Sequence, residues 1–184
     1  MKNLLAIFFA LIVGGTALFA QVAVAAEKKV LVAYFSHTGT TEKVALEIQR
    51  QTGGDLFKVE TVQNYSTDHK KLVDYAKKEL AADARPSLKV SVTNLDAYDV
   101  VFVGYPIWWY TLPMPLFTFF ESHNFAGKTV IPFCTHGGSR LSGTVELIQQ
   151  LAPKAQVLEG LAISRKATSE IPEDVTEWLK KLKY

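Results

Sequence analysis

The chain has 184 residues, of which 48% are hydrophobic and 21% charged, and its formal net charge is +2. This length and composition are typical of one globular domain with a full hydrophobic core. The basic residues are scattered and form no stripe, which argues against nucleic acid as a partner. Cys134 is the only cysteine, so an internal disulfide is excluded.

The first 25 residues have the pattern of a secretory signal peptide. Lys2 gives a positive start, an apolar run covers Leu4 to Val13, and residues 23–25 form an A-x-A cleavage site. We expect cleavage after Ala25 and an exported, periplasmic domain of residues 26–184 without a stable membrane span. Its charge would be +1, because Lys2 is the only charged residue removed. An uncleaved membrane anchor is the alternative, which the short, glycine-broken apolar run disfavours.

Strand-like and helix-like segments alternate along the mature chain. Apolar runs predict five strands, at Lys29–Phe35, Asp55–Thr61, Asp99–Tyr105, Lys128–Thr135 and Gln156–Ile163. Amphipathic runs predict five helices, at Thr41–Gln51, Asp68–Ala82, Pro113–Ser122, Leu141–Leu151 and Pro172–Leu182. The connector after the second helix leaves room for a short strand at Leu88–Val92. This alternation predicts an α/β fold, a parallel sheet with helices on both faces, whose ligands bind at the carboxyl ends of the strands.

The loop after the first predicted strand is rich in hydroxyl groups. It consists of Ser36, His37, Thr38, Gly39, Thr40 and Thr41. Hydroxyls and backbone N–H groups at the start of a helix suit an anion. The loop holds no lysine or arginine and no P-loop motif, so it predicts a small phosphorylated cofactor rather than a nucleoside triphosphate.

Two further loops at strand ends are unusual in composition. The aromatic loop after the third predicted strand contains Pro106, Ile107, Trp108 and Trp109. The loop after the fourth contains Thr135, His136, Gly137, Gly138 and Ser139. Its glycines allow close backbone approach to a ligand, and its polar side chains can form hydrogen bonds. No spacing of side chains indicates a metal site.

Together the three loops resemble those of flavodoxin-like proteins, which bind flavin mononucleotide (FMN). The motifs [ST]-x-T-G-x-T, G-Y-P-I-W-W and C-T-H-G-G-S occur in that order, and the resemblance runs from Lys29 to about Tyr184. It implies a doubly wound five-stranded parallel sheet of order 2-1-3-4-5. It also implies that the first loop holds the FMN phosphate and that the other two flank the isoalloxazine ring.

The sequence leaves two possible roles open for several side chains. His136, the candidate catalytic group, could lie near the polar edge of the flavin or cap its own loop. His37 could approach the phosphate or be an exposed bystander, and Arg140 could attract an anion or be solvated. Cys134 suits a packed core residue better than a nucleophile. At least one of the two adjacent tryptophans is expected to face ligand or solvent.

Three functions follow from the resemblance. The first is an FMN-dependent oxidoreductase that takes electrons from NAD(P)H or another donor and passes them to a quinone or similar acceptor. The second is a flavodoxin-type electron carrier for a protein partner, and the third is a flavin-free interaction module. The near-neutral charge and the lack of glycine between Tyr105 and Pro115 favour two-electron chemistry over carrier function. Export argues against NAD(P)H as the electron donor, because nicotinamide donors are scarce outside the cytoplasm. The sequence is also compatible with a homodimer.

Overall fold

The computed structural model describes residues 28–183, so the expected signal peptide of residues 1–25 lies outside the described part. The strands are β1 (Val30–Tyr34), β2 (Asp55–Lys58), β3 (Val100–Pro106), β4 (Thr129–His136), β5 (Gln156–Val157) and β6 (Leu161–Ser164). The helices are α1 (Thr40–Thr52), α2 (His69–Ala81), α3 (Met114–Glu121), α4 (Thr144–Leu151) and α5 (Ile171–Lys181), with a 3-10 turn at Leu95–Ala97. None of these helices is long and apolar enough to cross a membrane.

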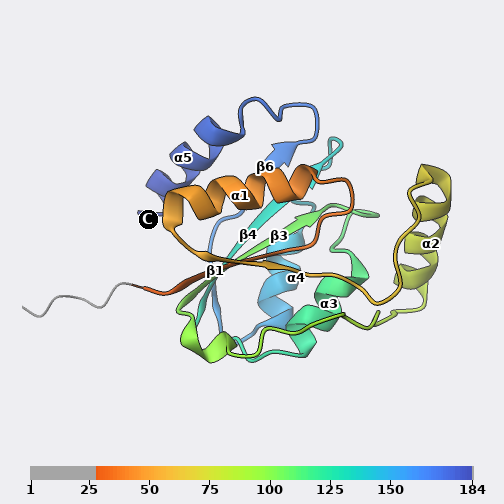
Figure 1. The fold of residues 1–184 in the computed structure, drawn as a ribbon, viewed down its shortest axis with the longest axis horizontal. Coiled ribbons are helices and arrows are strands. Elements are labelled where there is room, and N and C mark those ends of the chain that lie inside the picture. The colour runs from red at the N-terminus through yellow and green to blue at the C-terminus, as the bar shows by residue number, and fades with distance from the viewer. Residues whose placement is uncertain (1–27, 184) are drawn as a thin grey trace, which may run out of the picture.

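The strands form one parallel sheet in the order β2-β1-β3-β4-β5, with β6 also pairing with β4 (Figure 1). The predicted fold class and strand order are therefore confirmed. The carboxyl ends of β1, β3 and β4 meet at one edge of the sheet, where the loops after these strands begin. The fold thus brings the three unusual loops of the sequence to a single edge.

The predicted fifth strand, Gln156–Ile163, is wrong as one element because it is split into β5 and β6. Leu158 N–H donates to Val130 O, so Val130 faces this edge strand, and Pro132, two residues on, faces it too. Proline has no N–H to donate, so the ladder is interrupted at that point. The Glu159 carbonyl in the gap instead accepts a hydrogen bond of 3.1 Å from Trp178 Nε1.

Three other predicted elements differ from the structure. The second strand, predicted to run to Thr61, ends at Lys58. No strand forms at Leu88–Val92, where the only pairing is an isolated antiparallel bridge between Thr61 and Leu88. The helix predicted from Leu141 begins at Thr144 instead. Its first predicted turn is irregular because Ser142 and Gly143 have φ of 51° and 73°, which no right-handed helix accommodates.

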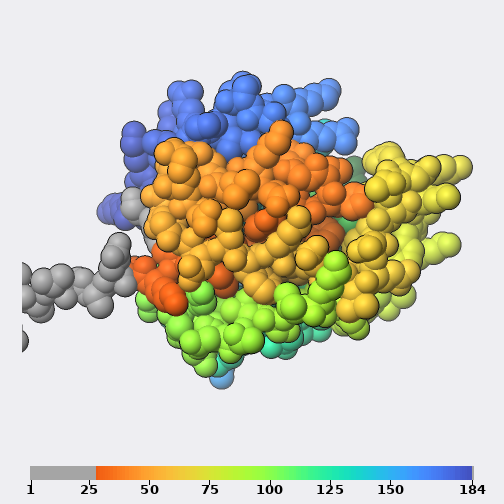
Figure 2. Space-filling model, in the orientation of Figure 1, coloured from red at the N-terminus to blue at the C-terminus, as the bar shows by residue number. Residues whose placement is uncertain are grey.

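The sheet separates two hydrophobic cores. Alternate residues of each strand face opposite sides, so Leu31 packs under α3 and α4, whereas Val32 packs under α1 and α5. The second core contains Val175 and Trp178 of α5. Figure 2 shows α1, in orange, lying beside α5, in blue, on the outside of that layer. Burial on both faces explains why β1, β3 and β4 are almost continuously apolar.

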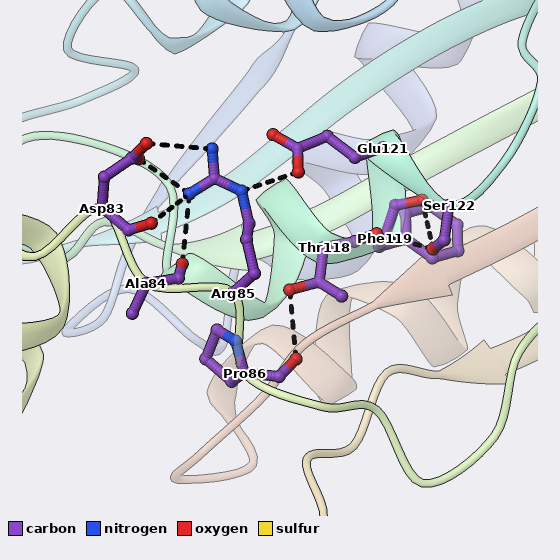
Figure 3. A network of polar contacts seen from close by, with 8 residues as sticks. All are labelled: Asp83, Ala84, Arg85, Pro86, Thr118, Phe119, Glu121 and Ser122. Atoms are coloured by element: carbon purple, nitrogen blue, oxygen red, sulfur yellow. Dashed lines mark hydrogen bonds and ion pairs between the residues drawn. The ribbon is translucent and has the colours of Figure 1, made fainter.

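Helix α2 belongs to neither core. It stands at the edge of the molecule toward which β3 and β4 point (Figure 1). The residues that follow it tie its carboxyl end to α3: Arg85 forms ion pairs of 2.7 Å with both Asp83 and Glu121, and Thr118 donates to Pro86 O (Figure 3). Because α2 is held at the edge, one of its sides is free to form a wall beside the strand ends.

Candidate cofactor site

A cavity of about 270 Å³ lies at the carboxyl edge of the sheet, and we call it the main cavity. Eleven of the predicted site residues line it, from all three loops: His37, Thr38, Thr40, Thr41, Pro106, Ile107, Trp108, Trp109, Thr135, His136 and Gly137. Ser36, Gly39, Gly138 and Ser139 are not among its lining residues. The structure therefore gathers residues more than 90 positions apart in the sequence into one site.

The hydroxyl-rich loop, residues 36–41, presents unused hydrogen-bond donors. Gly39 has φ of 83°, a conformation that glycine adopts without strain, and it turns the chain directly into α1. Ser36 Oγ accepts a hydrogen bond of 3.2 Å from Glu42 N–H, so Ser36 satisfies one N–H group of the first helical turn, whose N-cap is Gly39. Within residues 28–183 the N–H groups of Thr38 and Gly39 have no acceptor. The start of a helix also leaves its first N–H groups without an intrahelical partner, here those of Thr40 and Thr41. These donors form a cradle suited to an anion.

The threonines of this loop do not have equal roles. Thr38 and Thr40 contact each other through their hydroxyls at 3.3 Å and lie at least partly exposed. Thr41 is only 1% exposed, and its hydroxyl shares a 2.8 Å hydrogen bond with that of Thr135. This buried bond ties the start of α1 to β4. Thr38 and Thr40 are therefore the hydroxyls that remain available to a ligand.

The aromatic loop is a tight hairpin. Trp108 and Thr111 exchange both backbone hydrogen bonds, at 3.1 and 3.0 Å, around the two-residue turn Trp109–Tyr110. Both turn residues have positive φ, 49° and 64°, as in a type I′ turn. Such angles strain side chains other than glycine, by about 1–2 kcal/mol per residue. The strain is opposed by Trp109 Nε1, which donates to Val73 O at 3.1 Å, and by Lys77, whose Nζ lies 5.1 Å from the Trp109 ring centroid.

The two tryptophans face different surroundings, as expected for neighbours on a short loop. Trp108 packs edge-on against Phe35 at 5.4 Å and Tyr65 at 5.1 Å between ring centroids. Trp109 is 40% exposed. His37 also packs against Trp108, with 6.2 Å between the centroids, so it is not an exposed bystander. Tyr105, in contrast, is fully buried and belongs to the core below α3 and α4.

His136 both caps its loop and lines the main cavity. It is 9% exposed, and its Nδ1 accepts a hydrogen bond of 3.0 Å from Gly138 N–H. A neutral ring with an accepting Nδ1 carries its proton on Nε2. Burial, and then the charge of Arg140, lower the pKa of His136. The two interpretations made from the sequence are thus compatible.

This environment predicts the titration of His136. We expect an NMR titration to give His136 a pKa below the ordinary value of about 6.5, and Arg140→Gln to raise it, because a repulsive charge is removed. Since the unfolded chain binds this proton more tightly, His136 lowers the free energy of unfolding as pH falls below about 6.5. Arg50→Gln, on the far end of α1, is the control and should leave the His136 titration unchanged. An upward-shifted pKa would contradict this description of the site.

One wall of the main cavity consists of residues that the sequence does not predict. Helix α2 contributes His69, Leu72, Val73 and Ala76 to the lining, and the chain after β6 contributes Arg165. Arg165 lies beside Gly137, where an added Cβ would be 3.6 Å from the guanidinium carbon. Its position just past a strand end could have indicated it, had β6 been predicted separately. Nothing in the sequence places α2 at this edge.

A shallower, more open depression adjoins the main cavity. It is lined by Ile107, Trp109, Tyr110, Gly137, Gly138 and Ser139, so the remaining glycine-loop residues lie here. Among the sixteen residues that line the main cavity, which all lie in the described part, none is a carboxylate. No cluster of metal-ligating side chains occurs between residues 28 and 183.

Cys134 lies beneath the site without reaching it. Its side chain is fully buried, and burial raises the pKa of its thiol to about 12. At pH 8 only about one thiol in 10⁴ would be ionised. We therefore expect the folded chain to resist alkylation by iodoacetamide at pH 8, and the unfolded chain to react readily. Mass spectrometry measures the extent of alkylation over time. Rapid modification of the folded chain would contradict the burial of this thiol.

Comparisons with known proteins agree with this geometry. A flavodoxin family model matches residues 29–182. A candidate flavoprotein from Bacteroides eggerthii is 34% identical, with a TM-score of 0.75 over 85% of this chain and 99% of that one. Another, from Bacteroides uniformis, is 33% identical, with a TM-score of 0.74 over 83% and 98%.

A flavoprotein from Lactobacillus acidophilus, solved in complex with FMN, is 23% identical, with a TM-score of 0.63 over 79% of this chain and 97% of that one. It shares the fold. No curated protein matches the chain. The family match covers nearly all of the described residues, and the chain belongs to the flavodoxin family.

Proposed function

We propose that this chain holds FMN in the main cavity and acts as an oxidoreductase that passes electrons to a quinone or a similar acceptor. The observation that supports this best is that one cavity is lined both by the anion cradle, through His37, Thr38, Thr40 and Thr41, and by the aromatic ring of Trp108. A phosphate at one end and a flat apolar ring system at the other are the two features of FMN. Membership of the flavodoxin family supports the same cofactor.

The donor set fits FMN. The cradle offers neutral N–H and hydroxyl donors, and the cavity lining includes the cationic Arg165 but no carboxylate among the described residues. Hydrogen bonds to a charged group contribute about 1.5–3 kcal/mol each, so several of them stabilise a bound phosphate substantially. FMN, when bound, supplies hydride and electron transfer, and the protein supplies binding and orientation.

The chain's own residues have distinct tasks in this proposal. Thr38, Thr40 and the free N–H groups bind the phosphate, and Trp108 shapes the apolar part of the cavity and excludes water from it. His136 holds a proton at Nε2, where it can donate to a polar atom in the cavity, while its Nδ1 is occupied by Gly138 N–H. Its lowered pKa keeps the ring neutral at physiological pH.

The hairpin favours two-electron chemistry over service as a one-electron carrier. Many carriers that this family resembles have a glycine in the aromatic loop, which lets a peptide flip, whereas here Trp108 and Thr111 fix the turn with two backbone hydrogen bonds and no glycine. We also propose export to the periplasm, where a membrane quinol or a partner protein would replace the scarce nicotinamide donor. The observation behind export is the signal-like composition of residues 1–25.

The test starts from the full chain expressed with its leader. Mass spectrometry of the periplasmic fraction should give a polypeptide beginning after Ala25, and cytoplasmic retention of the uncut chain would contradict export.

After incubation with FMN and desalting, the protein should keep its yellow colour. Anaerobic titration with NADH, NADPH and a soluble quinol then identifies the donor. Bleaching by dithionite alone would instead support a carrier that needs a protein partner, and loss of all flavin would support a flavin-free module.

A further inference from the structure

A second cavity, of about 360 Å³, lies behind the aromatic wall of the main cavity. Tyr65, Tyr75, Glu79 and Arg85 are among its lining residues. The ring of Tyr65 packs edge-on against that of Trp108, with 5.1 Å between centroids, and Trp108 lines the main cavity. One pair of rings in van der Waals contact therefore joins the two cavities.

Tyr65 is hydrogen-bonded to a buried carboxylate. Its hydroxyl donates to Glu79 Oε2 at 2.8 Å, and Glu79, on α2, is only 8% exposed. No ion pair in the described part of the chain includes Glu79. Burial raises the pKa of Glu79, and burial followed by the bond to Glu79 raises the pKa of Tyr65. The proton thus stays on the phenol at rest, with a basic acceptor already in contact.

Arg85 lines the same cavity but does not neutralise Glu79. Its guanidinium is engaged elsewhere, by Glu121 through Nε and by Asp83 through Nη1, both at 2.7 Å (Figure 3). Tyr75 adjoins the pair, because its ring lies 5.8 Å from that of Tyr65, and its hydroxyl acts with that of Tyr65 to oppose the rise that burial causes in the pKa of Glu79. Since Arg85 is engaged elsewhere, the carboxylate of Glu79 has no cationic partner among the described residues and can take up a proton from Tyr65.

We propose that Trp108, Tyr65 and Glu79 form a proton-coupled relay that removes oxidising equivalents from the main cavity. The inference rests on the proposed binding of FMN, because the oxidant we name is photoexcited oxidised FMN. That oxidant takes one electron from Trp108. Tyr65 then returns one electron to Trp108 while its O–H bond breaks and the proton passes to Glu79 Oε2. The products are a neutral Tyr65 radical, a protonated Glu79 and a restored Trp108, and the electron remains on the flavin.

Laser-flash absorption and freeze-trapped electron paramagnetic resonance of the FMN-loaded chain test the relay. In the unaltered protein we expect a tyrosyl radical, formed more slowly in deuterium oxide because a proton moves with the electron. Tyr65→Phe removes the donor and Glu79→Gln removes the proton acceptor while keeping its shape. In both we expect loss of the tyrosyl signal and persistence of the tryptophan radical. Tyr98→Phe removes a phenol that donates to another carboxylate, that of Asp55 at 2.8 Å, so it is the matched control and should keep the tyrosyl signal.

The two proposals fail in different ways. Absorbance after desalting reports flavin retention before any flash, so loss of flavin from the unaltered chain contradicts the proposed function. If flavin is retained and Tyr65→Phe or Glu79→Gln still gives the tyrosyl signal at the original yield, the relay is overturned alone. The relay is also overturned if the tyrosyl radical forms at the same rate in ordinary water and in deuterium oxide.

Discussion

Replacing both Thr38 and Thr40 by valine is expected to weaken FMN binding by about 10²–10⁴-fold. The two hydroxyls lie in the anion cradle and line the main cavity, and neither is committed to a buried partner as the hydroxyl of Thr41 is. Two hydrogen bonds to a charged phosphate contribute about 3–6 kcal/mol together, which is this range of affinity. Isothermal titration calorimetry of the purified variant with FMN gives the number directly.

Riboflavin, which lacks the phosphate, provides the internal control for this variant. Its affinity should be almost the same for the double variant and for the unaltered chain, because the isoalloxazine end of the cavity is unchanged. Thr129→Val makes the same chemical change at the opposite end of β4 and should leave FMN binding intact. If the double variant loses FMN and riboflavin affinity equally, the threonines do not recognise the phosphate.

Gly104→Ala is expected to destabilise the fold by about 3 kcal/mol or more. Gly104 lies opposite Phe133 in the β3–β4 ladder, and the ring of Phe133 covers the space where a side chain would start. An added Cβ would lie 2.1 Å from Phe133 Cζ, and Phe133 is fully buried, so the ring has little room to move. Urea denaturation followed by circular dichroism measures the loss in the free energy of unfolding.

A double-mutant cycle tests whether the ring is the cause. Phe133→Leu alone should cost about 1–2 kcal/mol through lost packing. Combined with Gly104→Ala, the shorter side chain should relieve the clash, so that the double variant is less destabilised than the sum of the two single variants by about 0.5–3 kcal/mol. Gly137→Ala, whose Cβ would meet nothing closer than 3.6 Å, is the matched control and should be nearly neutral. Strict additivity would contradict this explanation.

The sequence is sufficient to predict those parts of the fold that depend on the pattern of apolar and polar residues within one strand or helix. The apolar runs of β1, β3 and β4 and the alternating helices predict the parallel sheet, because strands buried on both faces leave an unmistakable signal. The three loops could be placed together for a topological reason, since parallel strands end at the same edge. The sequence therefore predicts that Thr38, Trp108 and His136 belong to one site, and all three line the main cavity.

Other features depend on contacts that no local pattern encodes. The division of the fifth strand results from Pro132 on the neighbouring strand, which removes a hydrogen-bond donor from the ladder. The position of α2 depends on Arg85 reaching Glu121, and on Trp109 reaching Val73 O. The amphipathic pattern of α2 predicts a helix but does not say which surface it covers. For that reason the helical wall of the main cavity and Arg165 were found only in the structure.

A crystal structure of the mature chain grown with FMN would test the proposed cofactor site most directly. We expect phosphate density at the N–H groups of residues 38–41, beside Thr38 and Thr40. We further expect the isoalloxazine ring between the aromatic hairpin at Trp108 and the glycine loop at His136. Density for the phosphate at another surface, or an empty main cavity in crystals grown with saturating FMN, would contradict the proposed site.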